Sequence, residues 1–377
     1  MSTAIDPRTG NAGTDSPAFG RFFLPGPTEV RPEVLAAMTK PMIGHRGSEI
    51  EALMARIAPR LQQVFRTAQP VFTVTSSATG LMEGGVRNAI RTRALCLVNG
   101  AFSARFYKAA LNSGLAADKL EVEPGHYHSA DILADALRRD HYDVVTVVHS
   151  ETSTGVLNPI KELAEVAHAT GDIVMVIDTV SSMAAAPIEV DAWNLDYVLT
   201  GSQKALALPP GLAFCTANER VMERARASRH RGLYFDLLEL YEYWKKHQTP
   251  NTPAVSLLYA LDVQLDYILE EGIEARWARH AAMAQRTWQW VEEQRALGRE
   301  ISILAPEGYR SPAVTCITAP PGRTGPELVQ ALKSKGFVVA SGYGNLKDKM
   351  IRIGHMGDHT VAELERLLDA LGDVLAA

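Results

Sequence analysis

The sequence contains little cysteine. Cys96, Cys215 and Cys316 are the only three among 377 residues, and each lies inside a short apolar run. None has a second cysteine or a histidine nearby at a spacing that would suit a metal ion. We therefore expect neither a disulfide framework nor a metal site, and we interpret the three residues as buried, reduced core thiols.

Long hydrophobic runs are also absent, and so is an excess of positive charge. No stretch approaches the roughly 18 to 20 apolar residues that cross a bilayer. Residues 1–20 lack the apolar centre of a signal peptide and read as a flexible N-terminal arm. The C-terminus carries no peroxisomal signal, and a net charge of −5 argues against nucleic-acid binding. We expect a cytoplasmic protein with neither a membrane nor a nucleic acid as partner.

The first part of the chain alternates short apolar runs with amphipathic stretches. The runs are rich in Val, Ile and Thr and have the length of strands, whereas the stretches between them carry apolar residues at helical period. This alternation predicts an α/β fold in which helices cover both faces of a mostly parallel sheet. The expected strands are 71–75, 94–98, 119–123, 143–148, 172–177, 197–201 and 211–216.

The pattern changes after Pro253. Long helical periodicity covers residues 254–295, and strand-like runs alternate with helix-like segments after it. Because 377 residues exceed what one hydrophobic core usually supports, we expect a large domain at 21–270 and a smaller C-terminal α+β domain at 271–377, divided inside a long helix. The strand-like runs of the smaller domain are 312–318, 336–341 and 349–354.

Two residues at expected strand ends could carry chemistry. Asp178 follows the apolar run VMVI, and Lys204 follows YVLTG inside the loop GSQKALALPPG. Ligands of open α/β sheets bind outside the carboxyl ends of strands. Taken singly, Asp178 is more often a helix cap and Lys204 a surface lysine. Apolar neighbours such as Ala205 and Leu206 would desolvate the Lys204 amine, lower its pKa and make it a better nucleophile.

A third segment, SSATG at 76–80, joins an expected strand to an expected helix over 78–90. Free backbone N–H groups and the dipole at a helix N-terminus favour a phosphate, although plain capping by Ser77 or Thr79 is an equal alternative. A Walker motif is lacking, so a phosphate here would belong to another cofactor. A phosphate cup, Asp178 and Lys204 together supply what pyridoxal phosphate (PLP) needs: a phosphate site, an acid for its ring nitrogen and a lysine for its Schiff base.

The sequence resembles the class V aminotransferases, in particular the branch of alanine–glyoxylate and serine–glyoxylate (serine–pyruvate) aminotransferases. The resemblance covers nearly the whole chain after residue 21. It implies the PLP-dependent transferase fold of type I, with a large domain built on a mostly parallel, seven-stranded type of sheet, and a homodimer with active sites at the subunit interface. The motifs are LPGPTEV (24–30), MIGHRG (42–47), SSATGLMEGG (76–85), HSETSTGV (149–156), IDTVSS (177–182), TGSQKALALPPG (200–211), TPNTPAVSLLYAL (249–261) and MIRIGHMGD (350–358).

Residue by residue, the resemblance implies how this chain would hold PLP. Lys204 would form the Schiff base and then move the proton, and Asp178 would pair with the pyridine nitrogen. Phe102 would stack on the ring in place of a family tryptophan and would keep a stacking face. The remaining contacts implied are Ser77, Ala78, Thr79 and Gln203 at the phosphate, Thr152 at the phenolic oxygen, Val180 on the opposite ring face, and Thr252 at the phosphate of the neighbouring subunit's cofactor.

The resemblance also implies a substrate site. Arg352 would bind the α-carboxylate of the amino acid, for which a planar guanidinium offers two parallel hydrogen bonds. Gly26, in the Pro-Gly-Pro turn, would lie nearby with its backbone groups at the substrate. His45 and Arg46 could enter the active site of the other subunit in a dimer and touch the substrate side chain, a possibility that the sequence leaves open.

We therefore predict a PLP-dependent aminotransferase that moves an amino group from alanine or serine to glyoxylate or pyruvate by ping-pong chemistry. Aspartate, 2-aminoethylphosphonate and ureidoglycine stay open as donors, with Arg46 as the candidate for a second anionic group. A PLP lyase or cysteine desulfurase on the same fold is the further alternative; the desulfurase is disfavoured, because Cys316, the only cysteine of the expected small domain, lies in a strand-like run. A binding protein that has lost PLP would be expected to lack Lys204 or Asp178, and both are present.

Three further groups are given structural interpretations. His126 and His128 lie in a turn without a third metal ligand, which favours a solvated loop. Residues 229–231 (RHR) form a small basic cluster that we expect on the surface. Aromatic residues at helical spacing over 241–244 indicate core or interface.

Overall fold

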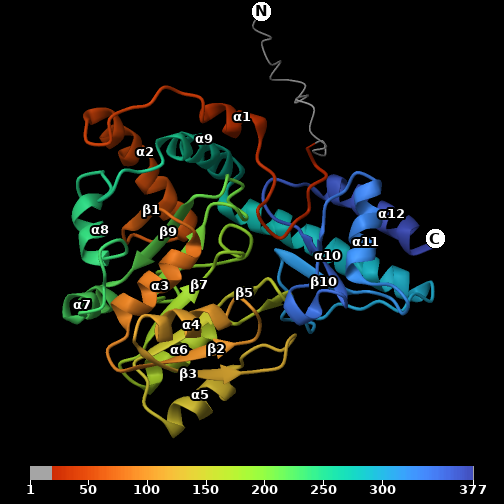
Figure 1. Cartoon of the computed structure of the whole chain (residues 1–377), viewed down its shortest axis with the longest axis horizontal. Helices are drawn as coiled ribbons and strands as arrows, with labels where there is room; N and C mark the ends of the chain where they lie inside the picture. Colours follow the sequence, from red (N-terminus) through yellow and green to blue (C-terminus); the bar gives the residue numbers. More distant parts are fainter. Residues whose placement is uncertain (1–18, 377) are drawn as a thin grey trace, which may run out of the picture.

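The computed structural model describes residues 19–376, so nearly all of the predicted N-terminal arm lies outside the described residues. Figure 1 shows a large sheet with helices on both of its sides and, beside it, a smaller group of elements that includes β10, α11, α12 and the C-terminus. Within the described part of the chain, no helix is both long and apolar enough to cross a membrane.

The large sheet has seven strands in the order β1-β9-β8-β7-β4-β2-β3. Only β9 runs antiparallel to its neighbours, and the other six strands run in one direction. The predicted mostly parallel, seven-stranded sheet is therefore confirmed. The strands are β1 (Val71–Thr75), β2 (Arg93–Val98), β3 (Ala116–Glu121), β4 (Val144–Val148), β7 (Val174–Asp178), β8 (Tyr197–Gly201) and β9 (Leu212–Ala217).

Helices cover both faces of this sheet, because its strands carry apolar side chains on both faces. In β4, Val145 and Val147 belong to one buried hydrophobic cluster, and Val144 and Val148 belong to the other. The helices on the first face are α1 (Pro32–Ala37), α2 (Ser48–Phe65), α5 (Ala130–Arg139), α6 (Ile160–Thr170) and α9 (Val255–Glu271). Those on the second face are α3 (Ala78–Ala89), α4 (Ala104–Asn112), α7 (Glu219–Ala227) and α8 (Leu237–Trp244).

A second sheet, of three strands, lies in the C-terminal part of the chain in the order β10-β12-β11, with both pairings antiparallel. A separate hydrophobic cluster joins it to three helices and includes Met283, Trp290 and, from the N-terminal segment, Phe23. The elements of this part are α10 (Ile273–Ala296), β10 (Val314–Thr318), α11 (Gly325–Ser334), β11 (Ala340–Ser341), the short 3-10 helix η1 (Gly344–Leu346), β12 (Met350–Gly354) and α12 (Val361–Ala376). Two short strands, β5 (Ser150–Glu151) and β6 (Val156–Leu157), pair with each other elsewhere in the chain.

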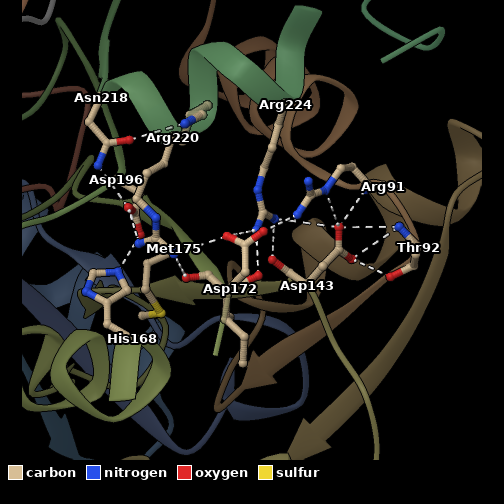
Figure 2. A network of polar contacts seen from close by, with 12 residues as sticks. Arg91, Thr92, Asp143, His168, Asp172, Met175, Asp196, Asn218, Arg220 and Arg224 are labelled. Atoms are coloured by element: carbon tan, nitrogen blue, oxygen red, sulfur yellow. Dashed lines mark hydrogen bonds and ion pairs between the residues drawn. The ribbon is translucent and has the colours of Figure 1, made fainter. Parts of the chain in front are cut away.

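Ion pairs join helices and strands at the edge of the sheet that is formed by the amino ends of the parallel strands (Figure 2). This edge lies opposite to the carboxyl ends of the same strands. Arg224, a buried side chain of α7, donates to Asp172 Oδ1 at 2.9 Å and lies 3.6 Å from Asp143 Oδ2. Asp196 accepts from His168 Nε2 at 2.7 Å and from Arg220 Nη1 at 3.0 Å. Since these aspartates precede β4, β7 and β8, the network fixes the strand starts relative to the helices beside them.

Most expected elements are confirmed, and three differ. The third strand covers 116–121 rather than 119–123, because it pairs with β2 over residues 93–98. Of the run 336–341 only the last two residues form a strand, since Val338 exchanges backbone hydrogen bonds with Arg21 and Phe23 instead. The long helix expected over 254–295 is broken at Gly272, whose φ of 82° ends α9. The division into domains at residue 270 stays a prediction.

The three cysteines are buried and free, as expected. His128 is a correction: its ring is fully buried and its Nε2 bonds the Leu120 carbonyl at 2.9 Å, whereas the sequence favoured a solvated loop. The prediction failed because the turn folds back onto β3, and only His126 is exposed. Among residues 19–376 no cluster of three metal-ligating side chains occurs.

Candidate active site

The carboxyl ends of the parallel strands meet at one edge of the large sheet, and chemically capable residues follow these ends. Strands that run in the same direction bring the residues after them to a common edge, where open α/β sheets bind ligands. The residues are Ser77 after β1, Phe102 after β2, Thr152 after β4, Asp178 at the end of β7, and Lys204 after β8.

A cavity of about 370 Å³ lies at this edge, between the large sheet and residues near β11 and β12. It is lined by all of the predicted site residues except Thr252 and Arg46. Those brought together are Gly26, Ser77, Ala78, Thr79, Phe102, Thr152, Asp178, Val180, Gln203, Lys204 and Arg352.

Lys204 is buried, and its Nζ donates a hydrogen bond to the Pro25 carbonyl. Gly26 leaves room for this side chain, because a Cβ on Gly26 would lie 2.4 Å from Lys204 Cδ. Burial, together with the charge of Arg352, lowers the pKa of Lys204 to about 8. The amine is therefore partly neutral near neutral pH, and the neutral amine is the form that attacks a carbonyl carbon.

The backbone of the lysine loop is held by the N-terminal segment. Thr28 N donates to Gln203 O at 3.0 Å, and Thr28 Oγ1 donates to Lys204 O at 2.9 Å. On the far side, the guanidinium of Arg276 donates to Ala205 O at 2.7 Å. These bonds fix the position of Lys204 from both sides.

Asp178 ends β7 with a buried carboxylate. Its Oδ1 accepts one hydrogen bond, of 2.7 Å, from Val180 N. Burial raises the pKa of Asp178 to about 7, against the lowering effect of that bond. A buried carboxyl group of this kind is stabilised as an anion by a cationic N–H group in the cavity, which is what a protonated pyridine nitrogen provides.

Ser77, Ala78 and Thr79, at the N-terminus of α3, line the same cavity. Ser77 is the N-cap residue and does not cap the helix with its hydroxyl, so the alternative of plain capping is wrong for Ser77. Gln203 lies against this terminus because Gly201 has no side chain: a Cβ there would lie 2.8 Å from Gln203 Oε1 and 3.3 Å from Ala78 Cβ. The first turn of α3 and Gln203 therefore form one group of neutral donors, suited to a phosphate.

Phe102 forms a wall of the cavity, and the loop that carries it is anchored by Glu151. The buried Glu151 carboxylate accepts from Phe102 N at 3.3 Å, Ser103 N at 2.8 Å and Ser103 Oγ at 2.9 Å. It also accepts from Ser153 Oγ at 2.5 Å. These bonds hold the aromatic ring in place.

Arg352 reaches the cavity from β12 and is 8% exposed. Its Nε donates to Ser341 O at 2.9 Å and its Nη1 to Thr152 O at 3.3 Å, so two neutral carbonyls hold the guanidinium. Within the described part of the chain no carboxylate pairs with it. Burial lowers the pKa of Arg352, and a carboxylate ligand would compensate for the lost hydration.

Sequence reasoning missed several residues of the cavity, above all Arg105 and Tyr343. The Arg105 guanidinium carbon lies 4.6 Å from the centre of the Phe102 ring, and Tyr343 lies 5.2 Å from that ring, centre to centre. The Arg352 guanidinium carbon lies 5.5 Å from the Tyr343 ring centre. Arg105, Phe102, Tyr343 and Arg352 thus form a row of neighbouring side chains along one wall, in which the two aromatic rings are tilted by 42°. The available signal for Arg105 was its place three residues after Phe102, in the first turn of the next helix.

Thr252 and Arg46 lie outside the cavity of this chain. Arg46 is exposed and donates to Thr249 O at 2.8 Å and Pro250 O at 2.7 Å, so its loop lies beside the loop of Thr252. Thr252 is exposed and borders a small hollow next to Tyr234. Both residues therefore belong to one surface region away from Lys204.

The buried lysine and acid, with a helix N-terminus beside them at the carboxyl edge of this sheet, define a PLP-dependent transferase of fold type I. The chain matches the model of the family "Aminotransferase class-V" over residues 22–367, and it belongs to that family. It is accordingly a PLP-dependent transaminase, and the resemblance seen in its motifs is confirmed.

Individual proteins are similar to the chain along most of its length. An uncharacterised aminotransferase of Methanocaldococcus jannaschii is 41% identical over 89% of this chain and 87% of its own length. The serine–glyoxylate aminotransferase of Arabidopsis thaliana is 31% identical over 93% and 88%, respectively. The crystal structure of the alanine–glyoxylate aminotransferase of Nostoc sp. superimposes with a TM-score of 0.89 at 29% identity, covering all of both chains.

Proposed function

We propose that this chain uses PLP to move an amino group from a small amino acid, alanine or serine, to a small 2-oxo acid, glyoxylate or pyruvate. The observation that carries the proposal is Arg352, a buried guanidinium held by two neutral carbonyls at the cavity wall. Such a group fits the α-carboxylate that amino acids and 2-oxo acids share. The names of the similar alanine– and serine–glyoxylate enzymes support small substrates.

The cavity residues fit the cofactor, and each would have a distinct task. Lys204 Nζ would hold PLP covalently, and the Asp178 carboxylate would keep the ring nitrogen protonated. Bound PLP supplies an acceptor for the electrons released when a bond to the amino acid Cα breaks. Phe102 and Val180 would cover the two faces of the ring. Thr152 would bond the phenolic oxygen; its hydroxyl now shares a 2.7 Å hydrogen bond with Ser181.

Lys204 would also move the proton. The Nζ of Lys204, whose pKa is lowered to about 8, would be able to take up a proton and give it back near neutral pH. The Arg352 clamp would fix the carboxylate so that the Cα–H bond faces Nζ. Pro25 and Gly26 close the cavity beside the lysine, which would exclude water from the reacting atoms.

We propose a homodimer in the cytoplasm as the functional form. Thr252 and Arg46, which the family resemblance directs toward the neighbouring subunit, share one surface region of this chain. Large apolar side chains are exposed there and next to it, with Met42 at 64%, Leu233 at 79% and Tyr234 at 40%. A surface of this kind favours a protein partner.

The test is a screen of half-reactions. The PLP-loaded enzyme is mixed with one amino acid at a time, and the loss of the visible absorption of the lysine-bound cofactor is followed. Alanine and serine should react fastest, and glyoxylate or pyruvate should restore the absorption. If aspartate, 2-aminoethylphosphonate or ureidoglycine reacts faster, the proposal that alanine or serine is the amino donor is wrong. The assignment of the protein as an aminotransferase would still hold.

A desulfurase function is poorly supported. Cys316 is fully buried in β10, and burial raises the pKa of its thiol to about 12. A desulfurase needs a reactive thiolate that can reach the substrate. The solved structure of a cysteine desulfurase from Thermococcus onnurineus shares the fold, with a TM-score of 0.73 at 14% identity, a level of identity that carries no argument about activity.

A further inference from the structure

Arg105 lines the cavity and has no role in the function proposed above. It lies in the first turn of α4, and its Nη1 donates a 3.4 Å hydrogen bond to Thr79 Oγ1. The guanidinium also stacks over the Phe102 ring. In the described part of the chain, then, its contacts are a neutral hydroxyl and a neutral ring, and no carboxylate forms an ion pair with it.

The three cationic side chains of the cavity lie in different places. Arg352 bonds Ser341 O and so lies at the small sheet. Lys204 bonds Pro25 O, beneath the N-terminal segment. Arg105 lies beside Thr79, at the N-terminus of α3. The full positive charge next to the predicted phosphate cup is therefore that of Arg105.

A phosphate ester needs such a charge. It carries close to two negative charges at neutral pH, whereas the N-terminus of a helix contributes the equivalent of about half a positive charge. The other expected donors, the hydroxyl of Thr79 and the amide of Gln203, are neutral. A guanidinium adds a formal charge and a planar set of donors that matches phosphate oxygens in pairs.

We propose that Arg105 binds the phosphate of the cofactor and supplies the formal positive charge of the phosphate site. The inference rests on the proposed use of PLP by this chain. Its contact with Phe102 gives Arg105 a second effect, because one guanidinium then touches both the phosphate site and the aromatic wall of the ring site. Arg105 would thereby link the binding of the phosphate to the position of the cofactor ring beside Phe102.

The test compares PLP with pyridoxal, which has the same ring and aldehyde but no phosphate. Dissociation constants of both are measured on cofactor-free protein from the visible absorption of the lysine-bound ligand. The variants are Arg105→Gln, which removes the charge, and Arg105→Lys, which keeps it. Lys108→Gln is the matched control: Lys108 follows one turn later on α4 and borders the neighbouring hollow with Arg105, but does not line the cavity.

Arg105→Gln should weaken PLP binding by about 10- to 100-fold, the range for one hydrogen-bonded charge pair, and should change pyridoxal binding little. Arg105→Lys should recover part of the PLP affinity. Inorganic phosphate should compete with PLP for the wild-type protein and much less for Arg105→Gln. Lys108→Gln should behave as wild type, and circular dichroism should show all variants folded.

Equal losses for PLP and pyridoxal would overturn the inference, because Arg105 would then act only through Phe102. So would a loss of the same size in Lys108→Gln. Unchanged PLP affinity with a raised KM for aspartate would also overturn it and make Arg105 a substrate residue. A wild-type chain that binds PLP but transaminates no small amino acid contradicts the proposed function and leaves the Arg105 result standing, whereas a wild-type chain that never binds PLP overturns both.

Discussion

Burial moves the pKa values of Lys204 and Asp178 toward one another, to about 8 and about 7. The two residues follow neighbouring strands, β8 and β7, and line one cavity. Near neutral pH, a fraction of the Lys204 amines is therefore neutral, and a fraction of the Asp178 carboxyl groups is protonated. Both shifts fit a cofactor that reacts with the neutral amine of Lys204 and places a cationic N–H group next to the carboxylate of Asp178.

The first prediction concerns the pH dependence of cofactor attachment. The neutral amine of Lys204 is the attacking form, so the rate at which cofactor-free protein acquires the visible absorption of bound PLP should rise with pH around a midpoint of about 8. Stopped-flow absorbance measures the rate. Lys204→Ala should show no covalent attachment after borohydride reduction and mass spectrometry; a reduced adduct on another lysine in that variant would refute the assignment.

The second prediction concerns Asp178 in cofactor-free protein. Its folded-state pKa, about 7, lies above its ordinary value of 3.8. Between these values the folded state binds a proton that the unfolded state does not, so the stability that the group contributes is present at low pH and is lost as the pH rises through about 7. Urea unfolding should find Asp178→Asn about as stable as wild type at pH 4 and more stable at pH 8. A difference that does not change with pH would contradict this.

Asp178→Asn should behave in the opposite way as an enzyme. The amide cannot hold a protonated ring nitrogen, so kcat should fall by at least about 100-fold, the size of effect seen when a charge-stabilising group is removed from an active site. Steady-state kinetics with the best amino donor measures the loss. Thr179→Ser, a conservative change at the next, buried residue, serves as the control and should retain activity.

The third prediction concerns Arg352. Arg352→Lys keeps the charge but loses the paired donors, so KM for the amino acid should rise by about 10- to 100-fold while PLP affinity stays unchanged. The control is Arg310→Lys, since Arg310 is partly buried, bonds Ala305 O at 3.2 Å and does not line the cavity. A change in PLP affinity without a change in KM would assign Arg352 to the cofactor instead.

The fourth prediction concerns stability at the opposite edge of the sheet (Figure 2). Arg224→Met removes the buried partner of Asp143 and Asp172 and should lower the free energy of unfolding by about 2 to 4 kcal/mol. The kinetic constants at low temperature should not change, because the network lies away from the cavity. Arg226→Met, on the exposed side of the same helix, should leave the unfolding midpoint where it is.

The fifth prediction concerns the oligomeric state. Leu233→Glu places a charge in the proposed interface, so it should shift the sedimentation coefficient from dimer toward monomer and lower activity with it. Leu297→Glu is the matched control, because Leu297 is also highly exposed, at 71%, but follows α10 in the C-terminal part of the chain. A wild-type protein that sediments as a monomer would remove the proposed roles of Thr252 and Arg46.

The sequence predicted the large sheet well because its strands are buried on both faces. Continuous apolar runs such as VVTVV of β4 leave little choice of structure. Prediction failed where backbone pairing depends on distant residues: Val338 bonds the N-terminal segment, and β3 takes its limits from β2. Local composition does not contain that information.

The site divides in the same way. Asp178 and Lys204 could be found because one ends a strand and the other lies in the loop after a strand, where geometry brings side chains to a known edge. Tyr343 could not be found in this way, since it lies in the C-terminal part of the chain and follows no strand of the large sheet, and Arg105 offered only its place three residues after Phe102. Glu151 was missed for another reason: its role depends on donors of Phe102 and Ser103, in a distant loop that only the folded chain brings to it.

The row of Arg105, Phe102, Tyr343 and Arg352 would also give the cavity a handedness toward its substrate. If Arg352 binds the carboxylate of an amino acid and the bound cofactor holds its nitrogen, as proposed, two positions of the substrate would be fixed, and Lys204 would provide a third point on one side. Three fixed points distinguish mirror images. Only one enantiomer would then turn its Cα–H toward Lys204 Nζ, so the same arrangement would also select the chirality of the substrate.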